Sequence, residues 1–463
     1  MTGASVNPAE IYSRQHTFFR TGRTWPVAFR REHLVRLGRA LIAHEPELLA
    51  ALHHDLGKSE IEAFASELGL VAREVSLAIK RLPAWIKPIR KPTPWLNWPA
   101  KSFQLPEPRG VVLIMGPWNY PVQLLLLPLV GALAAGCCAV VKPSEFTPAA
   151  SEVLQRLIRD IYPPEYCQVV TGTGQEAAAL LDLPWDHIFF TGSTRVGRLV
   201  MQAAAKHLTS ITLELGGKNP CIVLADTPLE IAAERIAWGK FLNAGQTCGA
   251  PDHCYIQRQV LGPFTEALKR VLTRFYGADP RQSPDFGRIV NIAHFDRLLG
   301  YLSQGRVLAG GQVDRGSRYV APTLMADVPE NAPLMQEEIF GPILPLLPFD
   351  DLDALLGILR DRPNPLAAYV FTRDAASQIK ALQHLRAGTM ALNDTMSQIT
   401  SSHLPLGGVG ESGQGRYHGQ ASFACFSHYK SVLAKGYIWN NRMKYPPYTV
   451  PLKWLKKFYA WLM

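Results

Sequence analysis

Apolar residues recur at helical spacing through the first part of the chain. In residues 30–56 (RREHLVRLGRALIAHEPELLAALHHDL), Leu and Ile return every three or four positions on a charged background, and residues 61–86 continue this pattern. Such periodicity predicts amphipathic helices over residues 10–85. Residues 87–108 are rich in Pro and Trp instead, which favours an extended arm or edge segment over a core element.

An uncharged stretch over residues 111–141 follows. It is long enough for a membrane span, but prolines and glycines interrupt it repeatedly. Parallel strands that are covered on both faces are continuously apolar. We therefore interpret the stretch as a buried strand (111–115), a packed helix (123–136) and a second buried strand (137–141).

Short apolar runs then alternate with helical segments along the chain. The first series of predicted strands covers residues 111–115, 139–143, 168–172, 187–192 and 211–215. The second series covers residues 221–225, 254–258, 344–349, 367–372 and 389–394. Alternating strands and helices predict open parallel sheets, and a break in composition near residues 216–217 separates the two series. We expect an α/β protein with two domains and a cleft between them.

The net charge of +10 is concentrated near the C-terminus. Eight Lys and Arg but no acidic residue follow Glu411, so the rest of the chain has 40 basic against 38 acidic residues. Nucleic-acid binding requires basic residues spread over a folded face, and we expect no such partner. In the segment PLKWLKKFYAWLM (451–463), one helical side collects Leu452, Leu455, Tyr459 and Leu462. Trp and Lys together suit a membrane interface, and packing on the protein or on a neighbouring subunit is the alternative.

The seven cysteines form no CxxC pair, and no Cys/His spacing suits zinc. We therefore expect no metal. The N-terminus lacks the charged-then-apolar profile of a signal peptide, so free thiols in a reducing cytoplasm are expected.

One cysteine, Cys248, lies among small residues in FLNAGQTCGAPDHC (241–254). A buried structural cysteine usually packs against bulky apolar groups, whereas a catalytic thiol needs access and help for its thiolate. Glu214, in TLELGGKNP (212–220), ends a predicted strand at the position where open α/β sheets bind ligands. An isolated Cys or Glu is more often structural, so neither residue is decisive alone.

Three further polar residues follow predicted strands. Asn119 in GPWNYP (116–121) could donate to a developing oxyanion, although a turn asparagine is the simpler interpretation. Lys142 and Glu145 in VVKPSE (140–145) could bind the hydroxyls of a nucleotide ribose, or could be ordinary surface residues.

Two glycine-containing turns compete as anion sites. In FFTGSTRVGRLV (189–200), Gly192, Ser193 and Gly197 leave backbone room where a helix begins. In VVTGTGQEAAALL (169–181), a Gly-x-Gly-x-x-Ala spacing fits the dinucleotide fingerprint. A short glycine pattern is a weak signal, and the pattern alone favours the second turn.

Taken together, these motifs resemble a known family. GPWNYP, KPSE, FTGST, LELGGK, GQTC and EEIFGP occur in this order and at these intervals, as in the NAD(P)-dependent aldehyde dehydrogenase superfamily. LPLGGVGESGQGRYHG (404–419), FSHYKSVL (426–433) and YPPY (445–448) are similar to its class 3 branch, which includes fatty and aromatic aldehyde dehydrogenases. The resemblance runs from about residue 10 to residue 450.

The resemblance implies a role for each motif. Cys248 matches the nucleophile, Glu214 the general base, and Asn119 the amide that binds the oxyanion together with the Cys248 backbone N–H. The residues that match the cofactor-binding set are Trp118, Lys142, Glu145, Gly192, Ser193, Gly197, Glu338 and Phe340.

Within that set, Lys142 and Glu145 match contacts to the adenosine ribose, and Ser193 matches the pyrophosphate contact, so the fingerprint at 169–181 is set aside. Glu338 and Phe340 match residues at the nicotinamide ribose and ring. The charge of Glu145 opposes a 2′-phosphate, which favours NAD and leaves NADP as an alternative.

Two residues depart from the family pattern. Gly249 stands where a branched residue commonly follows the cysteine, and Asn219 replaces a common Ser. Neither change removes a catalytic group, and Gly249 is expected to widen or loosen the pocket.

The resemblance predicts oxidation of an aldehyde to the carboxylic acid through a cysteine thiohemiacetal and a thioester, which a Glu-activated water hydrolyses. Medium or long aliphatic aldehydes, or aromatic ones, are the expected substrates. The alternatives are a dehydrogenase that transfers the acyl group to coenzyme A and a non-catalytic, membrane-associated scaffold on the same fold.

The expected organisation is a Rossmann-like cofactor domain (1–212) with an inserted oligomerisation arm (87–108), followed by a catalytic domain (213–395). A return segment (396–435) bridges the domains and the subunit interface, and a basic aromatic tail (436–463) follows. We expect a homodimer in the cytoplasm, with the tail either in peripheral contact with a membrane or packed on the protein.

Overall fold

The computed structural model describes residues 7–440 and 444–462, and the chain forms two compact units. The larger unit contains Met1–Trp85 and Pro108–Ser427, and the smaller one contains Ile86–Glu107 and His428–Met463. All of the candidate site residues lie in the larger unit.

The N-terminal region is helical, as its periodicity predicts. Its helices are α1 (Pro8–Arg20), α2 (Val27–Ala43), α3 (Glu45–Leu56), α4 (Glu60–Ala63) and α5 (Gly69–Trp85), with a π-helical turn (Phe64–Leu68) between the last two. Leu34, Leu37 and Leu41 of α2 are buried at helical spacing, because the helix covers the protein core with one face only.

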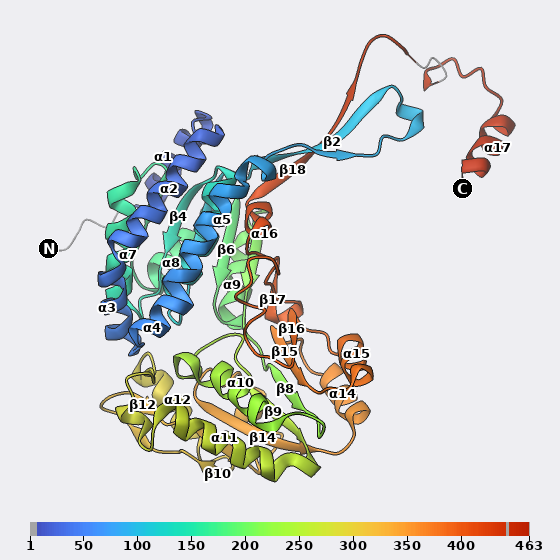
Figure 1. Cartoon of the computed structure of the whole chain (residues 1–463). Coiled ribbons are helices and arrows are strands. Elements are labelled where there is room, and N and C mark those ends of the chain that lie inside the picture. Colours follow the sequence, from blue (N-terminus) through green and yellow to red (C-terminus); the bar gives the residue numbers. More distant parts are fainter. Residues whose placement is uncertain (1–6, 441–443, 463) are drawn as a thin grey trace. The chain divides into compact units, whose positions relative to one another are not determined.

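A six-stranded sheet forms the first half of the larger unit (Figure 1), in the order β17-β7-β6-β3-β4-β5. Its strands are β3 (Val111–Met115), β4 (Cys138–Lys142), β5 (Cys167–Val169), β6 (His187–Thr191), β7 (Ser210–Glu214) and β17 (Gly413–Gln414). The five predicted strands are present and pair in parallel. The antiparallel edge strand β17 was not predicted, because two residues carry no side-chain pattern.

The uncharged stretch is a strand–helix–strand unit. Helix α6 (Gln123–Ala135) joins β3 to β4, and each of its residues is buried. It packs against α2, α5 and α16 (Gln420–Cys425), so it has no solvent-facing polar side. Among the described residues, no helix combines the length and the apolar character that crossing a membrane requires. The other helices of this half are α7 (Pro148–Ile161), α8 (Gly174–Leu181) and α9 (Thr194–Ala205).

A seven-stranded sheet organises the second half, in the order β10-β13-β14-β9-β8-β15-β16. Its strands are β8 (Pro220–Val223), β9 (His253–Gln257), β10 (Arg306–Ala309), β13 (Thr323–Ala326), β14 (Ile343–Phe349), β15 (Ala367–Phe371) and β16 (Thr389–Leu392). The predicted strands of this series are present, whereas the edge strand β10 and its neighbour β13 were missed. A separate hairpin pairs β11 (Val313–Asp314) with β12 (Tyr319–Val320).

Helices cover both faces of this sheet. Cys221 and Val223 of β8 join one apolar cluster and Ile222 joins the other, so successive residues of the strand are buried on opposite faces. Figure 1 shows α10 (Leu229–Phe241) and α11 (Leu261–Tyr276) beside the sheet. The remaining helices are α12 (Ile292–Tyr301), α13 (Pro333–Gln336), α14 (Leu352–Arg360) and α15 (Ala375–His384).

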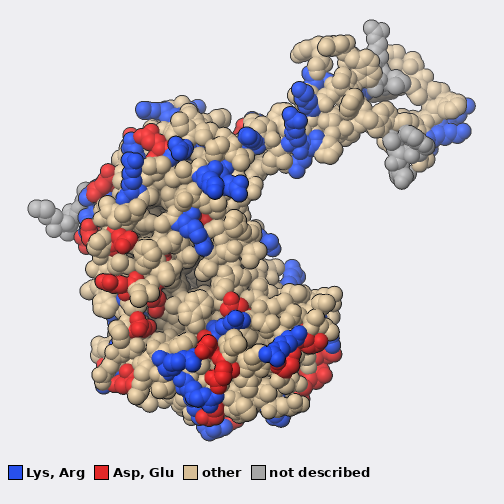
Figure 2. All heavy atoms as spheres, viewed as in Figure 1, with Lys and Arg blue, Asp and Glu red and all other residues tan. Residues whose placement is uncertain are grey.

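The smaller unit contains the predicted arm and the tail. β1 (Ile89–Lys91), β2 (Ala100–Pro108) and β18 (Ser427–Lys435) form a three-stranded sheet, and α17 (Leu452–Leu462) follows. The rings of Trp95 and Phe458 meet edge to face at 4.6 Å between centroids. Over this unit, Figure 2 shows blue basic side chains among tan residues. The division into a cofactor domain, a catalytic domain and a return segment stays a prediction.

Candidate active site

The site begins at the carboxyl-terminal edge of the first sheet. The pairs Met115–Lys142 and Thr191–Glu214 join neighbouring parallel strands, so the ends of β7, β6, β3 and β4 lie along one edge. The segments that follow these ends carry Asn119, Glu145 and Ser193. Open α/β sheets bind ligands at this edge because the loops there leave a crevice.

Backbone geometry explains the small residues before the cysteine. After α10, three consecutive residues have positive φ: Asn243 (+51°), Ala244 (+50°) and Gly245 (+74°). A Cβ on Gly245 would lie 2.3 Å from the carbonyl oxygen of Gly341, so only glycine fits. The chain thereby turns sharply and presents Cys248 at the cavity.

Two side chains, one just before β8 and one in β15, hold the cysteine loop. Asn219 Nδ2 donates hydrogen bonds to the carbonyls of Cys248 (2.7 Å) and Ala250 (2.9 Å), and its Oδ1 accepts from the Ala367 N–H (2.9 Å). The Tyr369 hydroxyl donates to the Gly249 carbonyl. A serine at position 219 would offer a single hydroxyl, so the amide gives the loop an additional fixed contact.

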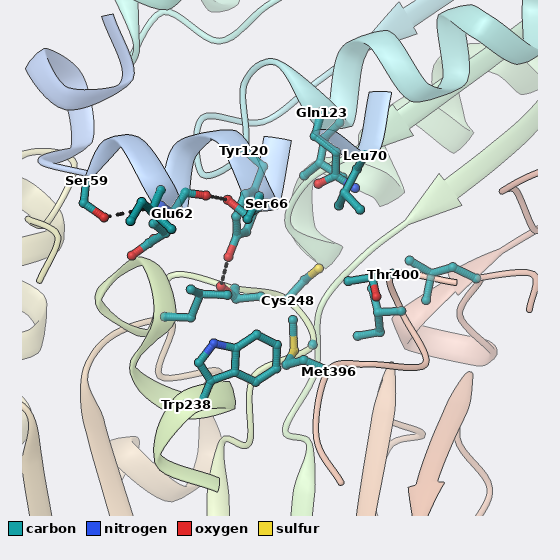
Figure 3. Close-up of a pocket in the computed structure, with 18 of the residues that line it drawn as sticks. Ser59, Glu62, Ser66, Leu70, Tyr120, Gln123, Trp238, Cys248, Met396 and Thr400 are labelled. Atoms are coloured by element: carbon teal, nitrogen blue, oxygen red, sulfur yellow. Dashed lines mark hydrogen bonds between the residues drawn. The ribbon is translucent and has the colours of Figure 1, made fainter. Parts of the chain in front are cut away.

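Cys248 and Glu214 line one cavity of about 570 Å³. Figure 3 shows Cys248 between Tyr120 on one side and Trp238 and Met396 on the other. The apolar residues of the wall include Leu70, Leu124, Trp238, Leu242, Phe275, Met396, Ile399 and Leu406. A thiol and a carboxylate therefore face a common, largely apolar space.

Burial controls the protonation of both groups. It raises the pKa of Glu214 well above its ordinary value, and Arg416 opposes this only in part. Neither carboxylate oxygen of Glu214 has a hydrogen-bond partner. Burial, with the charges of Glu338 and Glu214, also raises the pKa of the Cys248 thiol to about 12. Both groups therefore favour their neutral forms before a substrate arrives.

Asn119 is not among the residues that line this cavity, but it contacts the loop just before Cys248. It is buried, and its Nδ2 donates to the carbonyl of Gln246 at 2.9 Å. Next to it, the Tyr120 hydroxyl is 2.7 Å from Thr247 Oγ1. The structure thus joins the GPWNYP and GQTC segments immediately before Cys248.

Lys142 and Glu145 are neighbours. Lys142 Nζ lies 3.8 Å from Glu145 Oε2 and donates to the carbonyls of Pro143 (3.0 Å) and Gly172 (2.9 Å). Burial lowers the pKa of this lysine, and the charges of Glu145 and Glu176 oppose that shift. The lysine is therefore fixed in place, while the carboxylate of Glu145 is partly exposed.

The two competing helix starts differ in what fills them. The glycine fingerprint of residues 169–181 leads into α8. There, Glu176 Oε2 accepts hydrogen bonds from the Thr173 N–H (2.6 Å) and hydroxyl (2.9 Å). Glu176, a residue of this helix, thus forms a capping box with Thr173. At α9, the N-cap is Ser193, whose Oγ accepts from Val196 at 3.4 Å. A Cβ at Gly197 would approach Leu215 to 2.8 Å, so this glycine allows α9 to pack close to the sheet edge.

An aromatic cluster joins further candidate residues from both halves. The ring of Trp118 meets the ring of Phe340 edge to face at 5.2 Å and lies 5.1 Å from the ring of His294. Phe340 has φ +47°, a conformation that costs energy for a non-glycine residue and is frequent at ligand sites.

Glu338 lies apart from this cluster, in a second cavity of about 430 Å³ that Gly216 and Thr194 also line. Burial and the charge of Asp252 raise its pKa to about 8. Its carboxylate lies against Gly216, where a Cβ would clash with both oxygens. The glycine of LELGGK therefore makes room for the glutamate of EEIFGP.

Some residues of the site escaped the sequence analysis. Tyr120 and Gln246 lie inside quoted motifs, so their neighbours could have pointed to them. His294 has no such signal. Its Nδ1 is buried without a partner, and burial followed by the charge of Arg297 lowers its pKa to about 4.

Comparison with known proteins agrees with this geometry. The Aldehyde dehydrogenase family model matches residues 9–432. The 4,4'-diaponeurosporen-aldehyde dehydrogenase of Staphylococcus aureus is 43% identical over 96% of this chain and 97% of its own length. Human aldehyde dehydrogenase family 3 member B1 is 45% identical, over 93% of this chain and 92% of its own.

A solved structure of Staphylococcus aureus AldH in a substrate-bound state superposes with a TM-score of 0.95 at 42% identity. It covers 97% of this chain and 99% of its own. Together with the α/β architecture, these matches confirm the predicted fold class and the resemblance. The chain therefore belongs to the aldehyde dehydrogenase family, a family of NAD(P)-dependent oxidoreductases.

Proposed function

We propose that the protein oxidises an apolar aldehyde to the carboxylic acid, with Cys248 as nucleophile and Glu214 as general base. The observation that carries this proposal is that the two side chains line one cavity with largely apolar walls. An aldehyde whose carbonyl reaches Cys248 would place its hydrocarbon portion against those walls.

The first step is attack of the Cys248 sulfur on the carbonyl carbon. Because burial raises the thiol pKa to about 12, the thiol proton has to leave as the bond forms. Glu214, in the same cavity, accepts it in its ionised form and then releases it to solvent, so that the carboxylate is available again for the hydrolysis step. The new negative oxygen is stabilised by the Cys248 backbone N–H and by Asn119, whose amide has a second N–H besides the one that bonds Gln246. One such donor contributes about 3 kcal/mol to the transition state.

Bound NAD(P) supplies the hydride acceptor for the oxidation. The residues that support binding are Ser193 at the start of α9, Lys142 with Glu145, the Trp118–Phe340 pair and Glu338. We add His294, because its unpaired Nδ1 lies beside Trp118. The carboxylate of Glu145 repels a 2′-phosphate and supports NAD over NADP.

The last step is hydrolysis of the thioester on Cys248. Glu214 removes a proton from the attacking water, which requires its ionised form. Burial holds its pKa well above the ordinary range, so hydrolysis slows as the pH falls. Because Glu214 can activate water, its presence supports hydrolysis of the thioester over acyl transfer to coenzyme A.

A panel of aliphatic and aromatic aldehydes, assayed with NAD and with NADP, tests the proposal. We expect turnover of medium or long aliphatic or aromatic aldehydes and complete loss in Cys248→Ala. NADH production by that variant at the wild-type rate would refute the nucleophile assignment. Formation of an acyl-CoA product on addition of coenzyme A would establish the acylating alternative.

We also propose a cytoplasmic homodimer that touches membranes through its tail. Residues 86–107 and 428–463 contain a single acidic residue, Glu107, among many Lys and Arg. Tyr437, Ile438 and Trp454 are largely exposed, and aromatic and basic side chains together suit an anionic lipid surface. Co-sedimentation with phosphatidylserine vesicles should disappear on deletion of residues 436–463, and the molar mass in solution tests the dimer.

A further inference from the structure

A buried ion pair lies next to the site and has no role in the chemistry above. Lys58 Nζ lies 2.5 Å from Glu67 Oε1, and both side chains are 0% exposed. Burying two charges is expensive, and apolar residues of similar size are often as stable or more stable. The pair therefore calls for an explanation other than stability.

The other contacts of the Lys58 ammonium group are with the segment that follows β3. Its Nζ donates to the carbonyl of Asn119 at 2.9 Å and lies 4.0 Å from the centre of the Tyr120 ring. A cation above an aromatic face is attracted by the ring's negative charge density. Lys58 thus contacts two consecutive residues of GPWNYP.

The glutamate holds the same segment two residues later. Glu67 Oε2 accepts hydrogen bonds from the backbone N–H groups of Val122 (2.8 Å) and Gln123 (3.3 Å). Glu67 belongs to the π-helical turn, where the Gly69 N–H bonds to the Phe64 carbonyl five residues earlier. Such turns are rare in proteins, but those that occur are often at functional sites. This one places the Glu67 side chain in the interior.

The held segment in turn contacts the cysteine loop. Asn119 Nδ2 bonds to the Gln246 carbonyl, and the Tyr120 hydroxyl bonds to Thr247. Asn243 Nδ2 also donates to the Asn119 carbonyl, at 2.8 Å. Three hydrogen bonds therefore connect the segment that the ion pair holds to the loop that carries the nucleophile.

We propose that Lys58 and Glu67 are a positioning pair for the oxyanion hole. They fix residues 119–123 so that the Asn119 amide meets the carbonyl oxygen as Cys248 attacks. This inference rests on the oxyanion role of Asn119 in the proposed function. Hydrogen bonds at both ends of the segment fix its position and orientation, which apolar side chains in the same space would not do. A misplacement of about 1 Å can cost about 100-fold in rate.

The test removes both charges at once in Lys58→Met/Glu67→Gln, because a single neutral substitution leaves an unpaired buried charge. We expect kcat for aldehyde oxidation to fall by about 10- to 100-fold, with the KM for the cofactor unchanged. Hydrolysis of p-nitrophenyl acetate without cofactor should fall equally, since that reaction also forms an oxyanion. Alkylation of Cys248 by iodoacetamide should stay within about twofold, because displacement of iodide forms none.

Two further variants sharpen the test. Asp55→Asn is the control for loss of a buried carboxylate. Asp55 accepts a 2.9 Å hydrogen bond from the Ala150 N–H, and it does not line the cavity. Its kcat should match wild type. Lys58→Arg keeps the charge but alters the donor geometry. Should the double variant fail to fold, Lys58→Arg must show the same split between ester hydrolysis and alkylation.

Three results would overturn or redirect the proposal. A folded double variant with wild-type kcat overturns it. Alkylation that falls in parallel with kcat also overturns it, because the pair would then support the whole loop and not the oxyanion hole. Full activity in Asn119→Ala would instead refute the oxyanion role in the proposed function, whatever the pair does.

Discussion

Substituting Gly249 tests how closely the cysteine loop packs on the cavity wall. A Cβ at this position would lie 2.1 Å from Ile399 Cδ1 and 3.2 Å from Met396 Sδ. Carbon atoms in contact are normally about 3.5 to 4.0 Å apart, so the Ile399 methyl would have to retreat by about 1.5 Å. The backbone itself accepts alanine, because Gly249 does not have positive φ.

These contacts set the magnitude for Gly249→Ala. Overpacking of this kind costs about 1 to 3 kcal/mol, and the smaller unfolded-state entropy of alanine offsets about 0.4 to 1 kcal/mol. We expect a net loss of stability of about 1 to 2 kcal/mol. Because Ile399 lines the cavity, its displacement should also narrow the space for substrate, by about one methyl group. A change of that size alters kcat/KM by about 10-fold or more.

Two assays measure these effects. Urea unfolding followed by tryptophan fluorescence gives the stability change, and kcat/KM for a bulky and a short aldehyde gives the change in selectivity. The matched control is Gly249→Ala/Ile399→Ala, where the colliding methyl is absent, and the two substitutions should couple favourably by about 1 kcal/mol. A coupling below about 0.5 kcal/mol, with unchanged selectivity, would refute the packing argument.

Three further predictions concern the chemistry. Glu214→Gln should give a burst of NADH and then stall at the thioester, and a wild-type steady-state rate would require another base. Alkylation of Cys248 in the free enzyme should rise about tenfold per pH unit from pH 7 to 10, because the thiolate fraction increases up to a pKa of about 12; a plateau near pH 8 would contradict the raised pKa. Glu145→Gln should lower the KM for NADP relative to that for NAD by removing charge repulsion, whereas an unchanged ratio would show that this carboxylate does not face the 2′ position.

The sequence alone predicted the two parallel sheets, because their central strands are buried on both faces and read as uninterrupted apolar runs. It missed the edge strands β10 and β17 and the inner strand β13. β10 is half exposed and bulged between Val307 and Ala309, and β17 is two residues long. Short edge strands depend on a neighbour for their hydrogen bonds, and that neighbour is distant in sequence.

The motifs predicted which types of side chain form the site, but not the backbone conformation and contacts around them. Small residues around Cys248 predicted access, and the structure adds the reason: positive φ at three residues and the close approach of Gly245 to Gly341. Of the two glycine-containing turns, spacing alone favoured the fingerprint at 169–181. The Glu176 carboxylate accepts a hydrogen bond from the Thr173 N–H at the start of α8. This contact depends on the side-chain rotamer of Glu176 and not on the glycine spacing.

By itself, the sequence determined the fold class, the order of the elements and the chemical groups at each strand end, because these follow from periodicity and from residues close together in the chain. Only the tertiary structure decided which groups meet. Lys58, Glu67, Asn119 and Gln246 come from separate segments and join through contacts that no local pattern encodes. The raised pKa values of Glu214 and Cys248 have the same origin, because desolvation depends on what the rest of the protein packs around them.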